Sequence, residues 1–96
     1  MTENFVPCHN PLIVSQIGRG NVLAISGGRV QGRDTGITLP VAHGYKVTVD
    51  YTAADTYTVR RTYTRGAKVW VKAEWTDVHA AEVGGVAYKA SCYLDA

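Results

Sequence analysis

The chain has 96 residues, of which 46% are hydrophobic, and ten basic against eight acidic side chains give it a net charge of +2. This length suits one domain and leaves no room for a second core, so we expect residues 1–96 to form a single domain. The charge is too small to indicate nucleic-acid binding by itself. No apolar run reaches the roughly 20 residues of a membrane helix, and the N-terminus lacks a secretion signal. We therefore expect a cytoplasmic protein without membrane contact.

The two cysteines, Cys8 and Cys92, lie near opposite ends of the chain. A single pair in a chain without a secretion signal is more often two free thiols than a disulfide. His9 follows Cys8, but zinc sites usually combine two closely spaced pairs of ligands, which are missing here. The sequence therefore predicts neither a disulfide nor a metal site.

The N-terminal part predicts a short helix followed by a strand. Asn10 can cap a helix, Pro11 suits its first position, and apolar residues within 12–17 can form one stripe that ends near Gly18. Residues 21–26 are an apolar run that is too short for its period to separate helix from strand. Flanking glycines and β-branched residues favour a strand.

From residue 29 to residue 77 the pattern indicates β structure. Residues 37–41 alternate, and Pro40 places this strand at an edge or at a bulge. Residues 45–51 alternate between apolar and polar side chains, and 52–55 have the composition of a turn.

A hairpin is predicted next, with strands over 56–63 and 68–75. Gly66, inside the turn 64–67, can adopt the positive φ that tight hairpin turns require. Simple alternation divides the second strand into two faces, which carry Val69, Val71, Ala73 and Trp75 on one side and Lys68, Trp70, Lys72 and Glu74 on the other.

The chain closes with a predicted helix capped by Asp77. Apolar residues between 83 and 94 follow the i, i+3, i+4, i+7 spacing of one helix face. Gly84 and Gly85 each lower the stability of a helix by about 1 kcal/mol relative to alanine, so packing must hold this helix together. A close approach of the helix to the sheet would explain glycines at these positions. The rival interpretation ends the helix at these glycines and makes 86–94 a last strand. The predicted fold is α+β: an antiparallel sheet of about four strands flanked by an N-terminal and a C-terminal helix.

A set of short motifs from Ile17 onward resembles an uncharacterised family of small proteins encoded by tailed phages, prophages and plasmids. The matching positions, in order, are Ile17-Gly18, 21–27, 54–57, Val59, Arg65-Gly66, Lys68, Val71, 77–80 and Tyr93. His79 departs from the pattern, since members of that family tend to carry tyrosine there. The resemblance implies a mobile-element origin and a bacterial host, and it brings no activity and no site residues.

Catalytic patterns are absent from the sequence. No nucleophile-elbow pattern surrounds a serine, and a triad would have to be assembled from separate segments. On the predicted closing helix, His79 and Cys92 would lie about 20 Å apart, beyond hydrogen-bond reach. The glycine-rich stretches 18–20 and 26–28 match no phosphate-binding pattern and indicate turns. We therefore expect no enzymatic activity and no cofactor.

The hairpin combines basic and aromatic residues, with no acidic residue between 56 and 73. Single-stranded nucleic acid is often held by aromatic stacking and cations, and protein interfaces favour Trp, Tyr and Arg. Ordinary solvation of one sheet face explains the same composition without any ligand. The predicted binding residues are Arg60, Arg65, Lys68, Trp70 and Lys72.

We predict a small non-enzymatic accessory protein of phage or mobile-element origin that binds a host or phage protein through the hairpin. The alternative is binding of single-stranded nucleic acid through the same residues. An enzyme ranks third, and a virion component and a homo-oligomer stay open.

Overall fold

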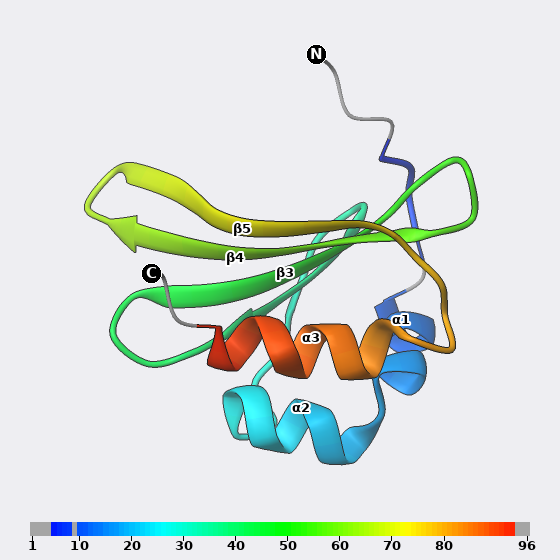
Figure 1. Ribbon diagram of the computed structural model, residues 1–96, viewed down its shortest axis with the longest axis horizontal. Coiled ribbons are helices and arrows are strands. Elements are labelled where there is room, and N and C mark those ends of the chain that lie inside the picture. Colours follow the sequence, from blue (N-terminus) through cyan, green and yellow to red (C-terminus); the bar gives the residue numbers. More distant parts are fainter. Residues whose placement is uncertain (1–4, 9, 94–96) are drawn as a thin grey trace.

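The computed structural model describes residues 5–8 and 10–93. In this part of the chain three helices lie on one face of a five-stranded antiparallel sheet (Figure 1). The predicted α+β class is confirmed, with five strands in place of about four. No helix in these residues is long and apolar enough to cross a membrane. The elements are α1 (Asn10–Ile17), α2 (Arg19–Ser26), β1 (Gln31–Gly32), β2 (Gly36–Pro40), β3 (Tyr45–Tyr51), β4 (Tyr57–Arg65), β5 (Lys68–Val78) and α3 (Val83–Cys92).

The strands follow one another across the sheet in the order β1-β2-β3-β4-β5. The alternation over 45–51 predicts β3 correctly, and the turn at 52–55 joins it to β4. β1 pairs only Gln31 with Thr38 and Gly32 with Ile37, so no described strand lies beside Pro40 on that side. This agrees with the expectation that Pro40 stands where its missing N–H is not required.

The core lies between the helices and the sheet. Alternate residues of β2, β3 and β4 face the helices, which cover them with apolar side chains of α1, α2 and α3. Fully buried members are Ile13, Ile37, Leu39, Val47, Val49, Val59, Val83, Ala87 and Ala90. We call this side of the sheet the helix face and the opposite side the open face.

The strand predicted over 21–26 is wrong, because these residues form α2. Gly18, at φ +94°, separates α2 from α1, and Val22 and Ile25 are buried at the i, i+3 spacing of a helix face. The Nδ2 atom of Asn21 donates a hydrogen bond to the carbonyl oxygen of Ile17, 2.9 Å away. Burial of Val22 and Ile25 against the rest of the protein therefore accounts for the helix, which the short apolar run could not indicate by its period.

The closing helix is confirmed, and the rival strand over 86–94 is contradicted by its described part, which α3 occupies to Cys92. Asp77 is not its cap, since β5 continues to Val78 and Asp77 has φ +54°. The predicted close approach exists, but toward α1. A Cβ atom at Gly84 would lie 2.4 Å from the carbonyl oxygen of Ile17.

Candidate binding surface on the β4–β5 hairpin

β4 and β5 are the longest strands of the described sheet, and their hairpin extends beyond α3 (Figure 1). The loop is Gly66–Ala67, and Gly66 has φ +60°, as the first position of a two-residue hairpin loop requires. The predicted hairpin is therefore confirmed. β5 forms the outer edge of the sheet, because it follows β4 at the end of the strand order.

Irregular pairing changes the faces that the side chains of β5 occupy. The register with β4 shifts at two places. At the shift nearer the loop, Arg61 pairs with Ala73 and Thr62 with Val71, which makes Lys72 an extra residue. The simple alternation predicted over 68–75 is therefore wrong.

The bulge at Lys72 places Trp70 and Glu74 on opposite faces of the sheet, although simple alternation predicted them on the same face. Trp70 pairs with Tyr63, so both lie on the helix face, and Lys68 shares that side by alternation. Val69 and Val71 lie on the open face. A one-residue insertion reverses every side chain that follows it, and the sequence gives no local signal for this one.

A row of three aromatic rings follows the helix face beyond α3. The ring centroids of Trp70 and Tyr63 are 5.7 Å apart, and those of Tyr63 and Tyr45 are 5.0 Å apart. Trp70 keeps 42% of its surface exposed. This aromatic row (Trp70, Tyr63 and Tyr45) is a rigid surface on which a planar or apolar group can lie.

Arg61 holds the inner end of the aromatic row. Its guanidinium carbon lies 4.1 Å from the ring centroid of Tyr45, and its Nη1 donates to the carbonyl oxygens of Ala90 and Ser91 at 3.0 and 2.9 Å. A cation at the C-terminal end of α3 meets the helix dipole favourably. The buried Nε of Arg61 has no hydrogen-bond partner among the described atoms. The side chain therefore fixes the end of α3 under the hairpin.

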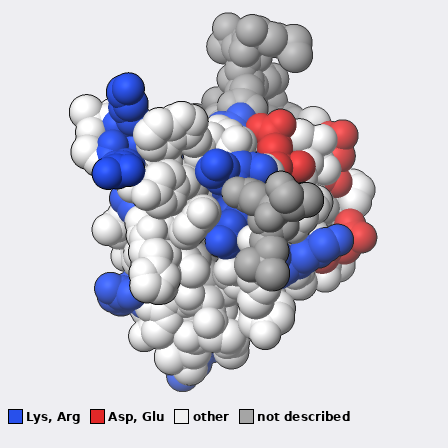
Figure 2. Space-filling view, turned by 60° about the vertical axis from the view of Figure 1, so that its left-hand side comes forward, with Lys and Arg blue, Asp and Glu red and all other residues white. Residues whose placement is uncertain are grey.

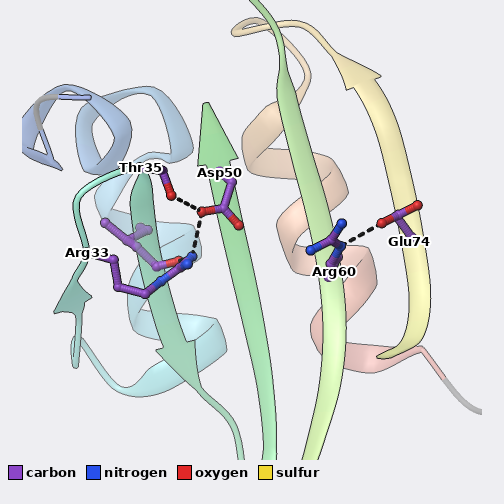
Figure 3. A network of polar contacts seen from close by, with 6 residues as sticks. Arg33, Thr35, Asp50, Arg60 and Glu74 are labelled. Carbon is purple, nitrogen blue, oxygen red and sulfur yellow. Dashed lines mark hydrogen bonds and ion pairs between the residues drawn. The ribbon is translucent and has the colours of Figure 1, made fainter. Parts of the chain in front are cut away.

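Arg60 lies on the open face, opposite Trp70. Its Nε is 2.6 Å from Oε2 of Glu74, and its guanidinium carbon is 5.2 Å from the ring centroid of Phe5. Figure 3 shows the pair in front of the sheet, with the helices behind. The predicted grouping of Arg60 with Trp70 on one surface is wrong, because the bulge turned Trp70 to the helix face.

A second ion pair fixes the other part of the open face. Nη2 of Arg33 lies 2.9 Å from Oδ1 of Asp50, which also accepts a hydrogen bond from Oγ1 of Thr35 at 2.8 Å (Figure 3). The same Nη2 donates to the carbonyl oxygen of Ile37. The buried carboxylate of Asp50 thus has two side-chain partners, and this network ties the β1–β2 loop to β3.

The outer edge of β5 carries three exposed apolar residues in succession. Val69, Trp70 and Val71 are 62%, 42% and 55% exposed. The N–H of Thr64 donates to the carbonyl oxygen of Gly44, on the side of β4 away from β5. Thr64 and its partner Val69 are therefore a non-hydrogen-bonded pair, and the backbone groups of Val69 point outward.

The backbone groups of Val71 also point outward. Val71 pairs with Thr62, two residues along each strand from the pair of Val69 with Thr64, and pairs two residues apart are of the same kind. The edge therefore presents the N–H and C=O groups of two valines beside exposed apolar side chains. Trp70 is among the binding residues predicted from the sequence, whereas Val69 and Val71 are not. Three consecutive apolar residues next to a hairpin turn were the available signal, because exposed edges usually avoid them.

The remaining predicted binding residues surround this edge. Arg65 and Lys68 pair with each other across the hairpin end, and Lys72 follows Val71. All three side chains are exposed. Figure 2 shows Lys and Arg in separate groups divided by uncharged surface, with the acidic side chains gathered toward one side. On the face drawn in Figure 2, the visible basic side chains do not form one continuous track.

Two tyrosines with raised pKa values lie at the other end of the sheet. Burial raises the pKa of Tyr57 to about 12, and its hydroxyl donates to Oε1 of Gln16. The hydroxyl of Tyr51 donates to Oδ1 of Asp55 at 2.5 Å, and this hydrogen bond raises the pKa of Tyr51. Both hydroxyls are thus donors in contacts that join neighbouring segments.

Other candidate sites are weaker. The residues that the structure describes contain no group of three or more His, Cys, Asp or Glu side chains able to hold a metal ion. No disulfide joins Cys8 and Cys92 in the described part of the chain, and His9 lies outside it. His79 precedes α3, so it does not share a helix with Cys92 as predicted. A hollow of about 250 Å³ on α2 is apolar, lined by Val14, Arg19, Val22, Leu23, Gly28 and Val30.

The hairpin surface is therefore the arrangement of described residues with the most features of a binding site. It combines an exposed edge, an exposed tryptophan and basic side chains around both. The resemblance to small phage, prophage and plasmid proteins remains a prediction. Comparison of the chain with protein-family models, with curated proteins and with solved structures finds no match.

Proposed function

We propose that this chain is a non-enzymatic binding protein of mobile-element origin, which binds a host or phage protein by accepting a strand at the outer edge of β5. The observation that carries the proposal is the exposure of Val69, Trp70 and Val71 on an edge strand with outward backbone groups. Strand addition obtains affinity from such backbone groups and specificity from the neighbouring side chains.

The length of β5 supports this proposal. Natural edge strands are usually short, charged or covered, and β5 has 11 residues. The bulge at Lys72 and the positive φ of Asp77 interrupt its second half, which limits pairing there. The regular stretch next to the loop stays available, and it contains the exposed apolar residues.

Single-stranded nucleic acid is the second candidate. The aromatic row supports it, because bases stack on such rings and Arg65 and Lys68 lie at the same end of the hairpin. On the face that Figure 2 shows, the visible basic groups are separate, and this supports a protein partner, since a strand of phosphates is usually followed by a continuous positive groove.

Affinity capture tests the proposed function. The parent protein, Val71→Pro, Trp70→Ala and Leu23→Ser are each immobilised and exposed to lysate of phage-infected bacteria. Proline at residue 71 removes an outward N–H without removing a bond to β4, and Leu23 is an exposed control on α2.

We expect a protein that the parent and Leu23→Ser capture and that both β5 variants lose. Val71→Ala, which retains the N–H, should capture more than Val71→Pro. Equal capture by all variants, or no capture by the parent, would exclude the edge of β5 as the functional site. Capture that ribonuclease or deoxyribonuclease abolishes would favour the nucleic-acid candidate.

A further inference from the structure

We propose that the strand bound by β5 is acidic, with the pattern acidic–apolar–any residue–apolar–acidic. This inference rests on the proposed function and adds the chemistry of the partner. It follows from three properties of residues 68–72: the outward backbone groups, the order of the side chains along the edge, and the charge around them.

The backbone groups define the centre of the bound segment. Val69 and Val71 each direct one N–H and one C=O outward, which fits a partner strand paired around Trp70. An extended partner can form bonds to both valines before the bulge at Lys72 disturbs the edge. The regular pairing is therefore short, and side-chain contacts on each side of it must contribute to the affinity.

The side chains define the composition of that segment. Partner residues opposite Val69 and Val71 lie on the open face beside exposed valines, so they should be apolar. The central residue meets Trp70 on the helix face. The next positions outward lie opposite Lys68 and Lys72, where opposite charges stabilise a cross-strand pair. The resulting pattern reads the same in both directions, so it suits an antiparallel or a parallel partner.

The surrounding charge makes acidic residues the favoured flanks. Arg65 adds a third exposed cation at the hairpin end, and the sequence has no acidic residue between 56 and 73. The nearest carboxylate along β5, Glu74, lies 2.6 Å from Nε of Arg60 on the open face. The stretch from Arg65 to Lys72 therefore contains three basic residues and no acidic one, and acidic flanks in a partner strand complement that charge.

The same lysines disfavour a second copy of this chain as the occupant. The sequence from Lys68 to Lys72 is Lys-Val-Trp-Val-Lys, which is symmetric about Trp70. Two copies paired antiparallel about Trp70 would match apolar residues but would place Lys68 opposite the partner's Lys72 twice. Like charges directly opposite one another destabilise a strand pair. An acidic segment keeps the apolar contacts and removes this repulsion.

Peptide binding tests the inference in the variant Trp75→Phe, in which Trp70 is the remaining tryptophan. The probes are short synthetic peptides with the cores Glu-Val-Tyr-Val-Glu and Lys-Val-Tyr-Val-Lys, and an acidic peptide of the same composition in scrambled order. Quenching of Trp70 fluorescence reports binding. We expect the acidic core to bind at least about tenfold more tightly than the lysine core, with the advantage decreasing as salt increases.

Charge reversal provides the matched control. In Trp75→Phe with Lys68→Glu and Lys72→Glu, the preference should invert, because the lysine core then meets carboxylates. Circular dichroism before titration verifies that this variant is folded. A structural effect of the two substitutions would weaken both peptides alike, whereas an inverted preference requires direct contact.

Each other outcome overturns the inference in a recognisable way. Equal affinity for the two cores, or for the scrambled peptide, removes the acidic pattern and leaves the capture experiment to decide on the edge site. No binding by any peptide also overturns the pattern. If single-stranded oligonucleotides quench Trp70 and displace the acidic peptide, the surface is one for anions in general, and specificity for an acidic strand is rejected.

Discussion

Tyr57 connects the sheet to α1, because its hydroxyl donates a hydrogen bond to Oε1 of Gln16. The side chain is 2% exposed, and burial raises its pKa to about 12 from the ordinary value of 10. The folded state thus favours the neutral phenol. The stabilisation that this preference provides is complete below pH 10 and is lost as the pH rises through about 12.

We therefore expect Tyr57→Phe to lower the free energy of unfolding by about 1 kcal/mol at neutral pH, where it removes one hydrogen bond. The difference from the parent should narrow above pH 10, because the variant lacks the group whose ionisation favours unfolding. Urea unfolding at pH 7 and pH 11 measures both values. Tyr88→Phe, at a position 46% exposed, is the control and should follow the parent. An unchanged gap at pH 11 would contradict the role assigned to Tyr57.

Among the elements, α3 depends on one of its two adjacent glycines. A Cβ atom at Gly84 would lie 2.4 Å from the carbonyl oxygen of Ile17 and 2.8 Å from Nδ2 of Asn21, whereas at Gly85 it would meet nothing within 4 Å. Gly84→Ala should therefore destabilise the protein by about 1–3 kcal/mol through overpacking against α1. Gly85→Ala should be neutral or stabilising by up to about 1 kcal/mol, because alanine favours the helix.

Thermal and urea unfolding of the two glycine variants provide a direct comparison. They share chemistry and helix, so a difference between them reports on the contact at Gly84 alone. If both variants were stabilised equally, α3 would not approach α1 as closely as the described backbone places it.

The elements also differ in how far the sequence predicts them. The alternation of apolar and polar side chains is sufficient to predict β3 and β4, and Gly66 identifies the hairpin turn. The segment 21–26 has too few residues for a period, and its burial against its neighbours made it the helix α2. The bulge at Lys72 depends on how β5 pairs with β4, which no local pattern encodes.

The candidate site follows the same division. Its position on the hairpin and the residues Arg65, Lys68, Trp70 and Lys72 could be named from composition. The placement of Arg60 and Trp70 on opposite faces could not be predicted, because it depends on the one extra residue in β5. The hydrogen bonds of Arg61 to the end of α3 could not be predicted either, because they join residues far apart in sequence.

On the scale of the whole molecule, an open five-stranded sheet must control which strands join its edge. Charge is the device available along β5, where Lys68 and Lys72 flank the exposed apolar residues. In a symmetric antiparallel pair of two copies centred on Trp70, these lysines oppose each other, which disfavours self-association. The single variant Lys72→Glu changes both contacts from repulsive to attractive.

We therefore expect Lys72→Glu to dimerise at concentrations where the parent is monomeric, with self-association at least about tenfold stronger. Sedimentation velocity at low and high salt measures the effect, which should weaken as salt screens the new pairs. The double variant Lys68→Glu with Lys72→Glu restores like charges opposite each other and should again be monomeric. A double variant that dimerises as strongly as Lys72→Glu would mean that lost repulsion from lysine, and not paired charge at this edge, drives association. A parent that is already dimeric would show that the flanking lysines do not protect the edge at all.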